Sequence, residues 1–165
     1  MKQNLIATTF VILAGAASAE TAKAVFLDAE GNQSGTAALS DTKAGVLVEI
    51  DVSGLPGSQW VAFHMHQTGT CDHVTHYDSA GGHFNSGEVP HGYLADGGPH
   101  AGDMPNQWVG ADGSLRAQVL NPAVTLADGE TGIRGRALMI HAGPDDYSTQ
   151  PTGGAGARLA CAVIK

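Results

Sequence analysis

Apolar and polar residues alternate along short stretches of this chain, and no long stretch repeats with the period of a helix. In residues 46–52 (VLVEIDV), every second residue from Val46 to Val52 is β-branched and apolar, and Glu49 and Asp51 fall between them. This is the period of a strand with one buried face. Similar short runs, separated by Gly-rich turns, occupy residues 24–28, 35–40, 59–66, 115–119, 136–142 and 158–164. Seven or eight short strands predict an all-β sandwich or barrel.

Two long segments interrupt this pattern, residues 67–110 and residues 142–157. Both are rich in Gly, Pro and Asp and carry little strand signal. Loops of this length inside a compact domain are usually functional or disordered. Seven of the eight histidines lie between positions 64 and 100, which favours a functional role.

The first nineteen residues have the composition of a signal peptide. Lys2 precedes the apolar run LIATTFVILAGA, which is too short to span a bilayer, and Ala17-Ser18-Ala19 fits the small-residue rule for cleavage. The alternative is a buried first strand or helix. We expect a signal peptide over residues 1–19, one domain over residues 20–165, and no lipid anchor, since no cysteine lies at the cleavage point.

The charge of residues 20–165 limits the possible partners. Seven basic residues against sixteen acidic residues give a net charge of −9. Nucleic acids and anionic membranes both bind basic faces, so neither is expected as a partner.

Cys71 and Cys161 are the only cysteines. In an exported protein they meet an oxidising compartment, so a disulfide is expected, the alternative being two free buried thiols. Closing a loop of about ninety residues stabilises a fold by roughly 4–5 kcal/mol in the chain-entropy model.

The run QWVAFHMH (residues 59–66) gives the first geometric prediction about the histidines. Alternation puts His64 and His66 on one face with Trp60 and Ala62, about 6.6 Å apart along the strand. The opposite face is the better core face and consists of Val61, Phe63 and Met65. The two histidines should therefore project from the outside of the β framework. Beside a His-rich loop, such a pair indicates a metal site rather than two solvated histidines.

The loop supplies further ligands. Its spacing H-x7-H-x8-H-x2-D, formed by His83, His91, His100 and Asp103, offers three imidazoles and a carboxylate, which suit a closed tetrahedral zinc site. His141 ends another predicted strand and is free to join His64 and His66. Nitrogen donors without sulfur suit copper in a flattened geometry. The chain therefore offers ligands for two different metals.

The ordered motifs FHMH, GGHFN, HG, HAGDMP, MIHAGPDD and GGAGARLACAVI together resemble the copper/zinc superoxide dismutases, over nearly all of the chain after residue 19. The runs Asp103-Met104-Pro105 and Ser148-Thr149-Gln150-Pro151 are most similar to the bacterial periplasmic branch. The resemblance implies an eight-stranded Greek-key β-sandwich or flattened barrel with two long functional loops. It also implies one copper and one zinc ion per subunit, and a periplasmic location.

The resemblance further implies a role for each site residue. Copper is expected on His64, His66, His83 and His141, and zinc on His83, His91, His100 and Asp103. His83 is shared, which requires a fully deprotonated imidazole. Asp145 is expected to link His64 and His91, and Arg158 to attract the superoxide anion; the alternatives are a turn acid and a surface arginine.

The implied reaction converts superoxide to dioxygen and hydrogen peroxide by alternation between Cu(II) and Cu(I), with His83 and Arg158 as the catalytic residues and zinc in a structural role. One alternative is a periplasmic copper or zinc storage protein on the same fold. Another is a β-sandwich interaction module with incidental histidines.

Two questions stay open from the sequence. His73 and His76 are either copper-collecting or simply solvated loop histidines. Trp108 and Tyr93 either anchor a homodimer contact or cover the barrel.

Overall fold

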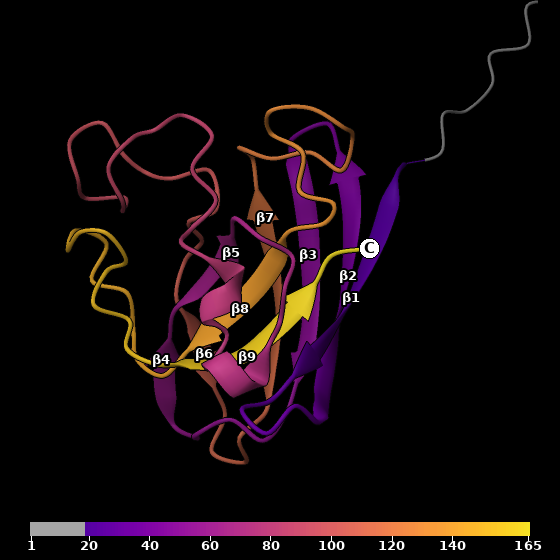
Figure 1. Cartoon of the computed structure of the whole chain (residues 1–165), viewed down its shortest axis with the longest axis vertical. Coiled ribbons are helices and arrows are strands. Elements are labelled where there is room, and N and C mark those ends of the chain that lie inside the picture. Colours follow the sequence, from indigo (N-terminus) through magenta and orange to yellow (C-terminus); the bar gives the residue numbers. More distant parts are fainter. Residues whose placement is uncertain (1–18) are drawn as a thin grey trace, which may run out of the picture.

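A computed structural model describes residues 19–165, which form an all-β domain. A seven-stranded sheet, in the order β5-β8-β9-β1-β2-β3-β7, curls around the core, and β4 and β6 form a small second sheet beside it (Figure 1). The described strands are β1 (Thr21–Leu27), β2 (Gln33–Thr42), β3 (Gly45–Val52), β4 (Gln59–Val61), β5 (Phe63–His66), β6 (Gln107–Val109), β7 (Leu115–Asn121), β8 (Ala137–His141) and β9 (Arg158–Val163). All pairings between them are antiparallel.

The predicted all-β fold is confirmed. Consecutive strands β1, β2 and β3 pair in order, but β3 then pairs with β7, and β8 lies between β5 and β9. These connections between non-adjacent strands are of the Greek-key type. The alternation predicted for residues 46–52 is also found, since Val46, Val48, Ile50 and Val52 are all buried in the core.

The predicted strand over residues 59–66 is divided in two. The break falls at Ala62, whose N–H donates to the Gly143 carbonyl and whose carbonyl accepts from the His141 N–H. On one side of Ala62, β4 pairs with β6; on the other, β5 pairs with β8. The chain therefore passes from the small sheet to the large one at this residue, and the domain has one more strand than the expected eight.

Strand β6 falls inside residues 67–110, where a loop was predicted, and that prediction is wrong at residues 107–109. The short sequence of β6 gives little strand signal. Its pairing with β4, in which Trp60 lies opposite Trp108, stabilises it as a strand. The predicted signal peptide lies, apart from Ala19, outside the residues that the structure describes.

The two long loops lie next to each other on one side of the sheet (Figure 1). The Leu94 N–H donates to the Tyr147 carbonyl, and Gln150 binds both backbone groups of His91. The predicted disulfide between Cys71 and Cys161 is present and ties the start of the first loop to β9. Among residues 19–165, no helix is long and apolar enough to cross a membrane.

Candidate metal centre

Strand β5 positions the first two histidines. Phe63 and Met65 point into the core cluster, so His64 and His66 project from the opposite face of the strand, as alternation predicts. Both are fully buried, because the two long loops cover this face. Residues 82–84 and 102–103 of the first loop bind to the backbone of β5: Met65 donates to the Gly102 carbonyl and accepts from Phe84. The loop residues are thereby held against the strand that carries the histidines.

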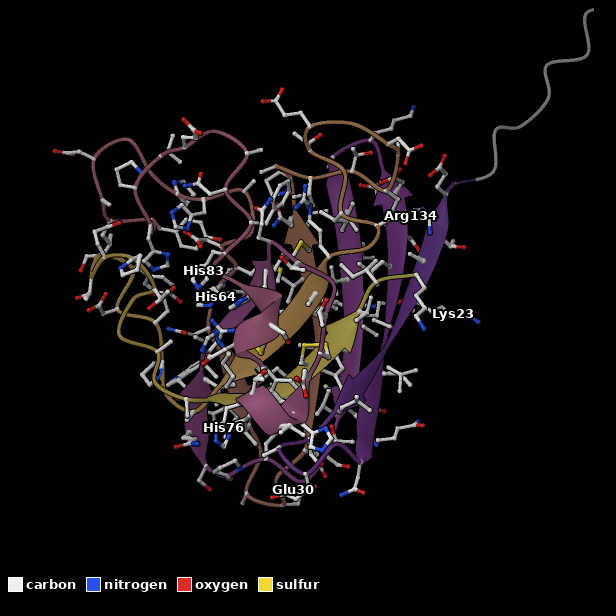
Figure 2. All side chains as sticks on the ribbon, in the orientation of Figure 1. Lys23, Glu30, His64, His76, His83 and Arg134 are labelled. Atoms are coloured by element: carbon white, nitrogen blue, oxygen red, sulfur yellow. A yellow bond between two sulfur atoms is a disulfide. The ribbon has the colours of Figure 1, made fainter. Side chains whose placement is uncertain are left out.

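Two groups of buried side chains form at this position. Their nitrogen and oxygen atoms lie within 4.8 Å of one another in each group. The first group contains His64, His66, His83 and His141, and the second contains His83, His91, His100 and Asp103. His83 belongs to both, and its ring centroid lies 3.9 Å from that of His64. Figure 2 labels the two residues beside each other.

Hydrogen bonds on the outer side of the rings fix which nitrogen faces each group. Asp145 lies between two rings, with His64 Nε2 at 2.9 Å from Oδ2 and His91 Nε2 at 3.0 Å from Oδ1. His66 Nδ1 donates to the Gly81 carbonyl at 2.9 Å, and His141 Nδ1 lies 3.4 Å from the Gly156 carbonyl. Such outer partners fix the tautomer and orient the ring for a metal.

The inward-facing atoms fit bound cations. Four buried ring nitrogens form no hydrogen bond of suitable geometry: His64 Nδ1, His83 Nε2, His91 Nδ1 and His100 Nδ1. His66 Nε2 and His141 Nε2 face each other at 3.3 Å. Unpartnered buried acceptors are costly, and neutral imidazole nitrogens are good ligands for copper and zinc. The oxygens of Asp103 lie 2.8–3.4 Å from the Nδ1 atoms of three histidines, so a shared cation suits the second group.

The protonation states are also those of ligands. Burial lowers the pKa of His64 to about 4, of His66 to about 2 and of His141 to about 3, so these rings are neutral at pH 7. Burial acts to raise the pKa of Asp103, but hydrogen bonds from His83 and from the Gly92 N–H hold it well below the usual value. The centre thus combines neutral imidazoles with an ionised carboxylate.

Arg158 lies beside the first group at the start of β9, opposite His141 in the strand register. Its guanidinium donates to the Tyr77 carbonyl and, at 2.8 Å, to the Gly81 carbonyl. The Gly81 carbonyl also accepts from His66, so a single acceptor joins the arginine to a histidine of the first group. The charge of Arg158 is close enough to contribute to the lowered pKa values of His66 and His141, although burial is the larger cause.

Several residues at the centre were not identified from the sequence. Asn106 forms a pair of hydrogen bonds with the backbone of Asp145, and Gln150 forms a similar pair with the backbone of His91. Gly153 has φ +68°, and a Cβ at this position would lie 1.8 Å from Asp145 Oδ1. His73 and His76 are exposed and belong to neither group.

A curled β-sheet that carries two buried ligand groups sharing one histidine defines a two-metal protein suited to copper and zinc. The profile of the copper/zinc superoxide dismutase family matches residues 33–164, and the chain belongs to this family. It is accordingly an oxidoreductase with copper and zinc as cofactors, as the sequence motifs predicted.

Bacterial relatives match over most of their length. The chain is 47% identical over 148 residues to superoxide dismutase [Cu-Zn] 2 of Aquifex aeolicus, covering 87% of this chain and 86% of the relative. It is 34% identical, over an alignment of 179 positions, to superoxide dismutase [Cu-Zn] of Brucella abortus, covering all of both chains.

Solved structures of similar proteins share the fold. The Cu/Zn superoxide dismutase from Brucella abortus superposes with a TM-score of 0.74 at 28% identity, covering 88% of this chain and 100% of the other. A SOD-like protein from Bacillus subtilis superposes with a TM-score of 0.81 at 32% identity, covering 85% of this chain and 95% of the other.

Proposed function

We propose that this chain converts superoxide to dioxygen and hydrogen peroxide, with copper held by His64, His66, His83 and His141 and zinc held by His83, His91, His100 and Asp103. The observation that carries this proposal is the position of His83 in both ligand groups, with Nε2 buried and unpartnered and Nδ1 2.8 Å from Asp103. A storage protein has no need of a residue that couples two ions. Bound copper supplies the one-electron redox couple, and bound zinc, which has no redox chemistry, supplies charge and a fixed ligand geometry.

His83 is also placed to handle a proton. If His83 held both ions, its ring would be fully deprotonated, and Nε2 would be a basic nitrogen inside the buried centre. Nε2 is therefore placed to take up a proton and to donate it to the reduced oxygen species. The ionised Asp103 lies 2.8 Å from Nδ1 and would hold the zinc ion together with it. Two protons and two superoxide anions thus yield one dioxygen and one hydrogen peroxide.

Asp145 is proposed to hold the two ligand groups in register. It contacts one histidine of each group through different carboxylate oxygens. Burial acts to raise the pKa of Asp145, but hydrogen bonds from His64, the Tyr147 N–H and His91 keep it below the usual value. An ionised Asp145 makes both rings better ligands, since it accepts from the nitrogen opposite the ligating one.

Arg158 is proposed to attract and orient the anion. Two of its N–H groups are bound to carbonyls, which fixes the guanidinium and leaves other N–H groups for a substrate. No other Lys or Arg lies in residues 59–115 or 142–158, and Figure 2 shows Lys23 and Arg134 on the β1 side, away from His64 and His83. With a net charge of −9 after residue 19, the long-range field opposes approach and the short-range field of Arg158 favours it.

The Arg158→Ile variant is expected to lose about an order of magnitude in rate while it retains both metals, since one charge at about 4 Å contributes roughly 1–4 kcal/mol. The wild-type rate should depend only weakly on ionic strength. Pulse radiolysis and metal analysis test both expectations. Arg116→Ile, which removes an exposed arginine of β7 paired with Asp51 of β3, is the matched control and should behave as wild type.

Two outcomes would contradict these assignments. A steep fall of the wild-type rate with salt that survives in Arg158→Ile would mean that another basic patch guides the substrate. A wild-type protein that binds one copper and one zinc ion per chain but does not consume superoxide would favour the storage alternative.

We propose that the chain is exported to the periplasm and cleaved after Ala19. The support is the composition of residues 1–19 and the disulfide between Cys71 and Cys161, a bond that persists in oxidising compartments. Sequencing of the N-terminus of protein purified from a periplasmic fraction should begin at Glu20. An intact Met1 in that fraction would contradict cleavage.

We propose further that the chain forms a homodimer through the face made by β4 and β6. Trp60 and Trp108 pack edge to face at 5.4 Å and are each about half exposed, 52% and 51%. Exposed aromatic pairs of this kind are enriched at protein interfaces. Sedimentation equilibrium should give twice the chain mass for the wild type and a monomer for Trp60→Ser/Trp108→Ser. A wild-type monomer at micromolar concentration would rule out a stable dimer.

A further inference from the structure

Tyr77 is a fully buried residue in the loop between Cys71 and His83, and it has no part in the ligand groups. Its ring packs in a small apolar cluster with Met139 of β8 and Cys161 of β9. Its hydroxyl donates to the carbonyls of Leu27 and Asp28, where β1 ends. Its backbone has φ +64°, a conformation that a bulky residue adopts only when its surroundings hold it there.

The backbone of the same residue holds Arg158. The Tyr77 carbonyl accepts from one guanidinium nitrogen, and the Gly81 carbonyl, four residues later, accepts from the other. Local hydrogen bonds connect the two acceptors, since the Ala80 N–H donates to the Tyr77 carbonyl and the Gly81 N–H donates to the Asp78 carbonyl. The position of residues 77–81 therefore determines where the guanidinium lies.

The disulfide does not fix this segment by itself. Cys71 lies six residues before Tyr77, and the intervening short 3-10 helix His73–Thr75 contains no buried residue. The next side chain after Cys71 that is buried is that of Tyr77. Residues 77–81 thus have attachments besides the disulfide: the phenol ring and its hydroxyl bind the end of β1, and Ala80 and Ser79 bond to residues 68–70.

We propose that Tyr77 is a positioning residue for the reaction: its hydroxyl, anchored on the carbonyls at the end of β1, fixes the carbonyls that orient Arg158. Burial, followed by the charges of Asp28 and Glu30, raises the pKa of Tyr77 to about 12, so the phenol keeps its proton and acts as a donor at neutral pH. Phe at this position keeps the packed ring but leaves the two carbonyls without this donor. This inference rests on the proposed role of Arg158 as the residue that binds the anion.

The test uses the copper- and zinc-loaded protein and compares Tyr77→Phe with wild type. Azide serves as the anion probe, and its dissociation constant is measured from the visible copper spectrum. We expect azide binding and the superoxide rate to weaken about threefold each, with unchanged metal content. Thr75→Val is the matched control: it removes a hydroxyl that donates to Asp72 in the same loop, and it should change neither quantity.

A double-mutant cycle separates positioning from a general loss of structure. In the Arg158→Ile background, Tyr77→Phe should have no further effect on azide binding or rate, because its action passes through the arginine. An equal threefold loss in that background would overturn the proposal and place the effect on the metal ligands. An unchanged azide constant in Tyr77→Phe alone would also overturn it.

Nuclear magnetic resonance of the diamagnetic Cu(I), Zn(II) protein distinguishes this inference from the role of Arg158. The Arg158 guanidinium N–H signals should be slow to exchange in wild type and fast in Tyr77→Phe. Equal exchange in both would show that the Tyr77 hydroxyl does not fix Arg158. If Arg158→Ile keeps the full superoxide rate while Tyr77→Phe speeds the exchange of the Arg158 N–H signals, Arg158 does not bind the anion. Tyr77 would still hold the Arg158 guanidinium in place.

Cys71→Ser, with metals kept saturating, gives a second variant that does not alter Tyr77. Its Arg158 signals should stay slow to exchange, because the hydroxyl anchor remains. Fast exchange in Cys71→Ser would show that the disulfide, and not Tyr77, fixes the segment.

Discussion

His83→Ala is expected to reduce superoxide consumption by about two orders of magnitude or more, the range that a positioned proton donor alone contributes. The reason is structural as well as chemical. His83 is the one residue common to the two ligand groups, so alanine removes a donor from each and leaves three in each. The proposed proton carrier is lost at the same time. Stopped-flow measurement of superoxide decay gives the size of the loss.

The same variant tests whether the two ions are coupled. In wild type, addition of zinc to the copper-loaded protein should shift the visible copper spectrum, because the His83 ring changes its charge when it binds the second ion. In His83→Ala the spectrum should hardly respond. His73→Ala, which removes an exposed histidine outside both groups, should keep the wild-type response. If zinc shifts the spectrum equally in wild type and His83→Ala, His83 does not bridge.

The strands could be predicted where the alternation of apolar and polar residues along the chain decides which side chains are buried. Strand β3 is an example, because the alternation from Val46 to Val52 fits only a strand with one face in the core. The break at Ala62 could not be predicted in this way. It depends on hydrogen bonds with Gly143 and His141, about eighty residues away, and the flanking apolar residues give no sign of it.

The ligand groups show a similar division. The histidines could be predicted because their residue type is rare and their order along the chain is specific. The residues that hold the centre in place could not be predicted, because Asn106 and Gln150 bond to the backbone of distant residues. Tyr77 contacts Arg158 through its own backbone carbonyl. An amide or a phenol in a loop has many ordinary uses. Only the contact between the two long loops identifies Asn106 and Gln150 as part of the centre, and the contact with Arg158 identifies Tyr77.

The metal-free protein is expected to lose stability steeply as pH falls from about 6.5 to 4. Burial lowers the pKa of His64 to about 4, of His141 to about 3 and of His66 to about 2, whereas each has a pKa near 6.5 in the unfolded chain. Above pH 6.5 the three rings are neutral in both states, so they add no pH dependence. Below it the unfolded chain binds protons that the folded protein excludes, and the free energy of unfolding falls.

The expected size follows from about 1.4 kcal/mol per pH unit for each ring, or at most about 4 kcal/mol per unit for three. By pH 5 the loss reaches roughly 6 kcal/mol, which is comparable with the whole stability of a typical domain. Urea titrations in the presence of a chelator, from pH 7.5 to 4.5, measure the change. His73→Gln/His76→Gln removes two exposed histidines and should leave the slope unchanged. A urea midpoint that stays constant from pH 7 to pH 5 would mean that the folded protein accepts these protons. The metal-free folded protein would then not keep His64, His66 and His141 neutral.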